Sequence, residues 1–307
     1  MDLSVELASR NKRGLPLANP MITASGTFGY GIEFANLIDI QRLGAIICKG
    51  TTLRPRRGNP PPRVVETPAG MLNSIGLQNI GVQALIREKA PIWAAWKVPV
   101  IVNIAGETVE EFSELAAALD AVPGVAGLEV NISCPNVAAG GMEFGKSPRM
   151  AAEVTAAVKA ATTLPVIVKL TPNVTSIVEV ARAVGEAGAD AVTAINTVTG
   201  MTIDIGKRAP ALGNVSGGLS GPAIKPVALF AVYQISRVVD IPVIGCGGIS
   251  TADDALEFIM AGASAVQIGT AGFVNPGAAL AVLQGIEDFM RAEGIESLLE
   301  LVGVARR

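Results

Sequence analysis

The chain has 307 residues, of which 50% are hydrophobic and 17% are charged, a composition that excludes a disordered protein. Its 24 basic and 27 acidic residues give a net charge of −3, so it lacks the excess of basic residues that is expected of a nucleic-acid-binding protein. The absence of histidine excludes imidazole catalysis and histidine-ligated metals, and three widely spaced cysteines predict neither a disulfide nor a metal site.

Eight short apolar runs predict β-strands buried on both faces. They lie within residues 20–26, 42–51, 98–106, 127–136, 164–172, 186–197, 241–249 and 260–271. Three of the runs begin with Pro-Val-Ile, and three others follow a Gly-Ala pair that ends a helical stretch. This recurring pattern indicates repeated βα units.

Helical stretches separate most of the predicted strands. Thr108 with Glu111, and Thr251 with Asp254, have the spacing of a capping box, and Ser147 fits an N-cap that is followed by proline. Apolar residues then recur at helical spacing after each of these starts. The same periodicity predicts helices over 177–184, 227–238 and 278–289.

Eight βα units in a chain of this length predict a closed (β/α)8 barrel (TIM barrel) formed by residues 1–307 as a single domain. An open, doubly wound sheet is the alternative, although no topological break is evident. Residues around Arg10 to Gly14 predict a short hairpin at the barrel bottom. The N-terminus does not resemble a signal peptide, and no run of 18 apolar residues predicts a membrane span, so we expect a cytoplasmic protein.

Polar residues follow the predicted strands, where a barrel of this type places its active site. They are Ser25, Lys49, Asn103, Asn131 to Cys134, Lys169, Asn196, Gly247, Gly248, Gly269 and Thr270. Any one of them could be polar simply because the chain leaves the core there. Two lysines and three asparagines at one mouth nevertheless indicate a pocket for a flat, anionic, amide-rich ligand.

The last two strands end in the sequences GCGGIS and IGTAG, whose glycines predict a phosphate site built from backbone N–H groups. As a dinucleotide fingerprint the first is weak, because no acidic residue follows at the expected distance. Cys134 heads a glycine-containing loop and is a candidate base, provided that positive charge lowers the pKa of its thiol. Cys48 and Cys246 lie in apolar runs and are interpreted as buried hydrophobes.

Several motifs resemble those of class 1 dihydroorotate dehydrogenases, in order and along nearly the whole chain. They are ASGTFGYG (24–31), KGTTLRPRRGNPPPR (49–63), GMLNSIGLQN (70–79), NISCPNVAAGG (131–141), INT (195–197), GGLSGPAIKP (217–226), GCGGI (245–249) and QIGTA (267–271). The pattern is most similar to the catalytic subunit of the NAD-linked class 1B enzymes.

The resemblance implies FMN at the barrel mouth, oxidation of (S)-dihydroorotate to orotate in pyrimidine biosynthesis, and Cys134 as the base that removes the C5 proton while hydride leaves C6. The residues implied for the dihydroorotate site are Lys49, Asn73, Ser74, Ile75, Gly76, Leu77, Asn131, Asn136, Asn196 and Thr197. Those implied for FMN are Ser25, Lys49, Gly50, Asn103, Asn131, Lys169, Ile195, Gly221, Gly247, Gly248, Gly269 and Thr270. A lysine at the flavin suits a reduced ring that tends to be anionic, and Lys169 is the candidate.

The resemblance also implies partners, because this chain has no convincing dinucleotide fingerprint and too few cysteines for an iron–sulfur cluster. Electrons would reach NAD⁺ through a second subunit carrying FAD and an iron–sulfur (2Fe-2S) cluster, in a heterotetramer built on a dimer of this chain. Four alternatives stay open at this point. They are a fumarate-reducing class 1A homodimer, an enzyme of the dihydropyrimidine dehydrogenase type, a non-catalytic FMN-binding module, and a Schiff-base aldolase that uses Lys169.

Overall fold

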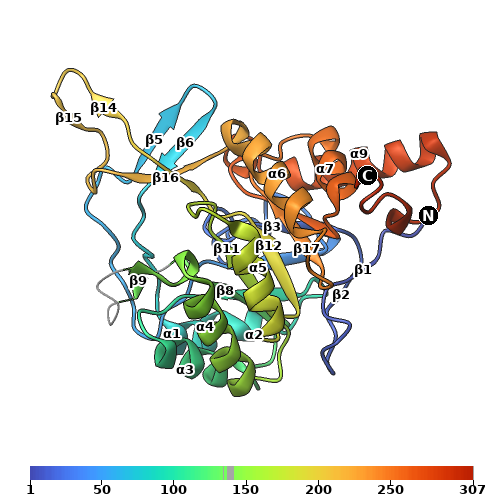
Figure 1. Cartoon of the computed structure of the whole chain (residues 1–307), viewed down its shortest axis with the longest axis horizontal. Coiled ribbons are helices and arrows are strands. Elements are labelled where there is room, and N and C mark those ends of the chain that lie inside the picture. The colour runs from blue at the N-terminus through green and yellow to red at the C-terminus, as the bar shows by residue number, and fades with distance from the viewer. Residues whose placement is uncertain (134, 137–141, 307) are drawn as a thin grey trace.

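Eight parallel strands close into a barrel at the centre of the computed structural model, which describes residues 1–133, 135–136 and 142–306 (Figure 1). In barrel order they are β3 (Met21–Thr23), β4 (Ala45–Ile47), β7 (Val100–Ile104), β8 (Gly127–Asn131), β11 (Val166–Leu170), β12 (Ala191–Ala194), β17 (Val243–Cys246) and β18 (Ala265–Ile268). Strand β18 pairs with β3 and closes the ring. Each predicted run contains one strand of the barrel, so the barrel is confirmed and the open sheet is wrong.

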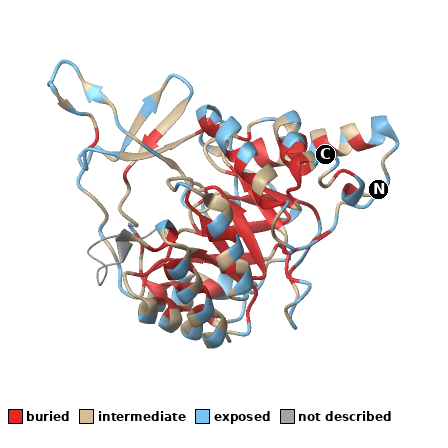
Figure 2. Ribbon diagram, in the orientation of Figure 1, coloured by how far each residue is buried: buried red, intermediate tan, exposed pale blue. Residues whose placement is uncertain are grey.

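Helices surround the barrel, and their inner faces join its buried centre (Figure 2). The α-helices are α1 (Val82–Glu88), α2 (Ala90–Trp93), α3 (Val109–Leu119), α4 (Pro148–Ala161), α5 (Ile177–Glu186), α6 (Lys225–Ile235), α7 (Ala252–Ala261), α8 (Ala271–Val274) and α9 (Ala278–Glu293). Short 3-10 helices are η1 (Ile40–Arg42), η2 (Phe144–Lys146), η3 (Pro222–Ile224) and η4 (Leu298–Glu300). Within the described residues, no helix has both the length and the apolar character that crossing a bilayer requires.

The predicted helix starts are confirmed, with one difference in detail. The hydroxyls of Thr108, Ser147 and Thr251 each accept a hydrogen bond from the backbone N–H three residues later. The capping box is complete at Thr251. At Thr108 the second hydrogen bond of the predicted box is wrong, because the Glu111 carboxylate accepts from the Glu107 N–H, at 2.7 Å, instead of from the Thr108 N–H. The Glu111 side chain packs over the Gly106–Glu107 turn and therefore reaches past the cap.

The N-terminal hairpin is confirmed, with β1 (Val5–Glu6) antiparallel to β2 (Pro16–Leu17). Its turn lies across the amino ends of the barrel strands. Asn11 donates to the carboxylate of Asp190, which directly precedes β12, and Arg13 lies 3.6 Å from Asp120. The hairpin therefore covers the face opposite the strand ends that were predicted to carry chemistry.

An antiparallel sheet over the carboxyl face was not predicted. Its order is β13 (Val198–Gly200), β16 (Gly217–Ser220), β6 (Gly70–Asn73) and β5 (Val64–Thr67). It joins segments that follow β4 and β12, and Figure 1 shows it projecting beside the barrel. Two smaller hairpins accompany it, β14 (Ile203–Asp204) with β15 (Ala209–Pro210) and β9 (Pro135–Asn136) with β10 (Met142–Glu143).

Candidate active site

A pocket of about 600 Å³ opens at the carboxyl ends of the barrel strands, beneath the antiparallel sheet. Apart from Cys134 and Asn136, every residue that the sequence assigned to substrate or cofactor lines this pocket. From the substrate set they are Lys49, Asn73, Ser74, Ile75, Gly76, Leu77, Asn131, Asn196 and Thr197. From the cofactor set they are Ser25, Gly50, Asn103, Lys169, Ile195, Gly221, Gly247, Gly248, Gly269 and Thr270.

Two residues of the predicted site are not placed in this way. Cys134 lies outside the described residues, and Asn136 is described only by its backbone, in strand β9. The neighbouring Ser133 is described and lines the pocket. The position of the predicted base therefore stays a prediction.

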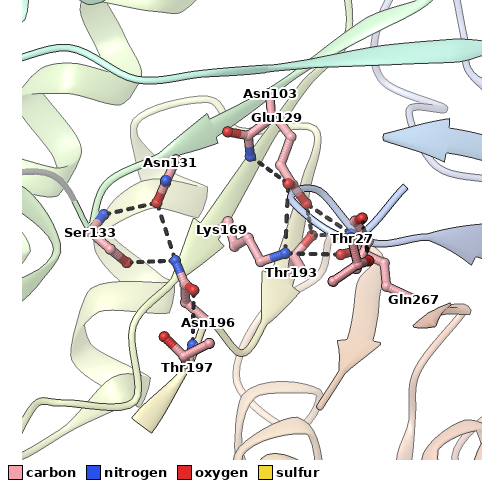
Figure 3. Close-up of polar contacts among 11 residues, drawn as sticks. Thr27, Asn103, Glu129, Asn131, Ser133, Lys169, Thr193, Asn196, Thr197 and Gln267 are labelled. Atoms are coloured by element: carbon pink, nitrogen blue, oxygen red, sulfur yellow. Dashed lines mark hydrogen bonds and ion pairs between the residues drawn. The ribbon is translucent and has the colours of Figure 1, made fainter. Parts of the chain in front are cut away.

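A buried polar network lies inside the barrel below the pocket (Figure 3). At its centre is the Glu129 carboxylate, which has no exposed surface. It accepts hydrogen bonds from Asn103 Nδ2 at 2.7 Å, Gln267 Nε2 at 2.8 Å and Thr193 Oγ1 at 3.0 Å. Lys169 Nζ lies 3.7 Å from Glu129 Oε2 and donates to Gln267 Oε1 at 3.0 Å. Alternation along the strands turns these side chains inward.

Lys169 is the cation of this network and is 5% exposed. Burial alone lowers the pKa of Lys169, but the neighbouring Cys246 and Glu129 raise it by more, so the ammonium form is favoured. Burial raises the pKa of the Cys246 thiol, and the Lys169 ammonium group offsets that shift only in part. Burial likewise raises the pKa of Cys48, to about 12, which agrees with the interpretation of both cysteines as buried hydrophobes.

Amides at the ends of β8 and β12 hold one another in place (Figure 3). Asn131 Oδ1 accepts from the Ser133 N–H and from Asn196 Nδ2, each at 3.2 Å. Asn196 Nδ2 also donates to Ser133 Oγ at 3.0 Å, and Asn196 Oδ1 accepts from the Thr197 N–H at 2.8 Å. The pocket wall on this side is thus a fixed set of polar groups, which favours recognition of a ligand with ring amides.

The segment from Asn73 to Leu77 forms another part of the pocket wall. Gly76 and Leu77 both have positive φ, 71° and 55°, and Asn59 fixes the turn by donating to the Ser74 carbonyl and hydroxyl oxygens. Lys49 also lines the pocket, and its burial lowers the pKa of the ammonium group, a shift that the Glu33 carboxylate offsets only in part. This partly desolvated cation suits a carboxylate ligand.

The glycine loops at the ends of β17 and β18, which were predicted to hold a phosphate, line the pocket, and the first packs closely against neighbouring backbone. Gly248 has a φ of 76°, and a Cβ added there would lie 2.6 Å from the Lys225 backbone nitrogen. Thr270 Oγ1 donates to Ser220 Oγ at 2.8 Å, which ties the last loop to the antiparallel sheet. At Gly248 the neighbouring backbone thus comes to a distance that a side chain would prevent.

Sequence reasoning missed Glu129, Thr193 and Gln267, because it considered only strand ends. The signal was available, since each is a polar residue inside an otherwise apolar run, GLEVN, AVTA and AVQI. It also missed Asn173, which lines the pocket beside the predicted asparagines.

Comparison with known proteins agrees with this architecture. The family model described as "Dihydroorotate dehydrogenase" matches residues 7–290. A protein of Geotalea uraniireducens (strain Rf4) is 58% identical over 302 residues, which cover 98% of this chain and 97% of that protein. One of Desulforamulus reducens is 60% identical over 291 residues, covering 95% and 96% respectively. Both are named dihydroorotate dehydrogenase B (NAD(+)), catalytic subunit. The chain therefore belongs to the dihydroorotate dehydrogenase family.

Proposed function

We propose that this chain oxidises (S)-dihydroorotate to orotate in pyrimidine biosynthesis, with FMN as its cofactor, and is the catalytic subunit of an NAD-linked enzyme. The observation that supports this most strongly is the convergence of the assigned residues on one pocket at the carboxyl face of the barrel. The names of the relatives support the same reaction and the same electron acceptor. The continuous core supports treating residues 1–307 as one FMN-binding domain. We also propose a cytoplasmic location.

The described residues fit FMN. Asn103 Oδ1 is buried at the pocket wall and has no hydrogen-bond partner among the described residues. It lies beside Gly50, where an added Cβ would be 3.1 Å from it. An unpaired buried acceptor is costly, so a ligand that brings an N–H to this wall is favoured. The oxidised isoalloxazine ring carries one such N–H, and the glycine loops suit its phosphate.

In the proposed reaction the chain holds the substrate and moves one proton. Lys49 would bind the carboxylate, while Asn73, Asn131 and Asn196 would bind the ring amides and carbonyls. The Cys134 thiolate would remove the C5 proton. The chemistry that FMN supplies when bound is acceptance of the hydride that leaves C6. The Lys169 ammonium group would balance the negative charge that arrives at the ring.

The test of the base is Cys134→Ser, followed by anaerobic stopped-flow mixing with dihydroorotate. We expect flavin bleaching to slow by at least about 100-fold at neutral pH, because a serine hydroxyl is a far weaker base than a thiolate. FMN content, read from the flavin absorbance, should stay at the level of the unsubstituted protein. An unchanged bleaching rate would remove Cys134 from its role, and a colourless native protein would overturn the proposal as a whole.

We also propose that electrons leave through a partner subunit with FAD and an iron–sulfur (2Fe-2S) cluster, in a heterotetramer built on a homodimer of this chain. The words "catalytic subunit" in the relatives' names support a partner. The purified chain alone is expected to bleach with dihydroorotate but to reduce neither fumarate nor NAD⁺ rapidly. Rapid fumarate reduction by the lone chain would instead indicate the class 1A activity.

A further inference from the structure

Glu129 occupies an unusual place for a carboxylate. It lies in the middle of β8, has no exposed surface, and does not line the pocket. Charged side chains are seldom buried in this way unless paired and hydrogen-bonded. Both conditions are met here, because three donors reach its two oxygens and the Lys169 ammonium group lies 3.7 Å away.

The donors and acceptors of this network are fixed by its two charged groups, because hydrogen bonds lead from the Lys169 ammonium group, through Gln267, to the Glu129 carboxylate. Lys169 only donates, so the side-chain oxygen of Gln267 must face it, and the Gln267 amide nitrogen then turns to Glu129. An ionised Glu129 only accepts, so Asn103 must turn its own amide nitrogen to Glu129 Oε2. Both amide orientations are therefore set by the charges of Lys169 and Glu129.

The orientation of Asn103 matters because Asn103 is a pocket residue. With Nδ2 held at 2.7 Å from Glu129, Oδ1 lies beside Gly50 at the pocket wall and has no partner in the part of the chain that the structure describes. A neutral amide at position 129 could instead donate to Asn103, which would then turn Oδ1 toward residue 129 and away from the pocket. The buried carboxylate thus decides whether this part of the wall offers an acceptor or a donor.

We propose that Glu129 is a positioning residue for the cofactor: it turns Asn103 so that Oδ1 accepts the ring N–H of the bound flavin, and it balances the charge of Lys169 beneath the ring. This inference depends on the proposed function, since it takes FMN as the ligand. Glu129 touches neither substrate nor cofactor in it, and acts through Asn103 and Lys169.

The variant Glu129→Gln is expected to turn the Asn103 side chain, so that a donor replaces the acceptor at the pocket wall. Gln267 and Thr193 both donate to Oε1, so the oxygen of the new amide takes the place of Oε1 and its nitrogen faces Asn103. Two amide nitrogens cannot share that contact, and Asn103 must rotate and present Nδ2 to the pocket. The flavin N–H then meets a donor, and we expect FMN affinity to fall by about 10- to 100-fold.

Exchanging the carboxylate and the amide between positions 129 and 103 should restore an acceptor at the pocket wall. In the double variant Asn103→Asp with Glu129→Gln, the aspartate accepts from the new amide and keeps its second oxygen for the cofactor, and the interior keeps its net charge. Asn103→Asp alone instead sets two carboxylates against each other across the 2.7 Å contact. We expect the double variant to bind FMN within about 3-fold of the native protein and each single variant to bind it more weakly.

The experiment is titration of each apoprotein with FMN, followed by flavin fluorescence, with thermal unfolding as the control for folding. Thr193→Val is the matched control, because it removes one donor to Glu129 and one acceptor of Gln267 without touching Asn103, and its FMN affinity should stay near the native value. Rescue by the double variant would support the positioning role, which a merely structural role of Glu129 does not predict.

The outcomes separate the two proposals. Equal FMN affinity of the native protein and the Glu129→Gln variant would overturn the positioning role and leave the proposed function intact. If Glu129→Gln alone does not fold, the double variant is compared with Asn103→Asp, and equal affinities of these two would overturn the role in the same way. Failure of the native protein to bind FMN would overturn the proposed function and this inference together.

Discussion

Lys169 and Glu129 form a pair whose members depend on each other. Their side chains are 7% and 0% exposed, so neither charge is screened by water. Removal of one partner of a buried pair leaves the other charge uncompensated, which typically costs about 3–5 kcal/mol. Lys169→Ala is therefore expected to lower the free energy of unfolding by about 3 kcal/mol, measured by urea denaturation of the apoprotein.

A matched control is available at the surface. Arg291→Ala breaks a pair with Asp288 whose side chains are 64% and 58% exposed, and it should cost less than about 1 kcal/mol. Similar losses for the two variants would contradict the interpretation of the Lys169–Glu129 pair as a buried one.

Lys169→Ala is also expected to affect flavin reduction more strongly than orotate binding. The lysine is assigned to the flavin ring, so flavin reduction should slow by about 10-fold or more, while the dissociation constant of orotate changes by less. Stopped-flow bleaching and orotate titration measure the two effects on the same sample. A reduction rate equal to that of the native protein would remove the assigned role.

At the scale of single elements, helix α7 begins at a complete capping box and ends at Gly262, whose φ is 118°. Thr251→Ala removes the hydroxyl that accepts from the Asp254 N–H, and we expect a loss of about 1 kcal/mol of stability in urea denaturation. Thr251→Ser keeps the acceptor and should retain most of that stability. Equal losses for the two variants would mean that the threonine methyl group, rather than the cap, is responsible.

The sequence predicted the elements that are buried and regular, namely the barrel strands and the helices around them. The eight strands were evident because strands covered on both sides are continuously apolar, and Ser147 with Pro148 marked a helix start. The antiparallel sheet was missed because its strands are short, half-exposed and rich in glycine, as in β16 (GGLS). Its pairing depends on contacts between distant segments, such as Leu72 with Leu219, which leave no local periodicity.

The same limit applies to the site. Strand-end residues such as Asn196 could be found because a closed parallel barrel brings all its carboxyl ends together. The role of Glu129 could not be found, because its meaning depends on which side chains of four other strands converge on it. Most residues that line the site were visible as polar strand ends, whereas those that orient the lining were marked only by their polarity within apolar strands.

At the scale of the whole molecule, Asp120 joins three segments at the barrel bottom. Its carboxylate accepts from Thr162 Oγ1 at 2.6 Å and from the Thr163 N–H and hydroxyl, and lies 3.6 Å from Arg13 of the hairpin turn. The Thr162 hydrogen bond is the largest cause that lowers the pKa of Asp120, to about 2, from an ordinary value of 3.8. The stabilisation is complete above the unfolded pKa and is lost as the pH falls through the folded one.

Asp120→Asn is therefore expected to destabilise the protein at pH 7 by up to about 1 kcal/mol, since solvent screens this partly exposed group. The difference between variant and native protein should shrink as the pH falls from 4 toward 2. Urea denaturation midpoints at pH 7, 4 and 3 measure it, and a difference that does not depend on pH would contradict the assignment.

The hairpin β14–β15 projects from the antiparallel sheet, and its turn, residues 205–208, is fully exposed. If the backbone were severed there, the first fragment would keep six barrel strands and the second would keep β17 and β18. The ladders β12–β17, β18–β3 and β16–β6 would still span the break. The gene could thus be divided at this turn into two complementing halves, whose reassembly would rebuild a pocket that each half only partly encloses.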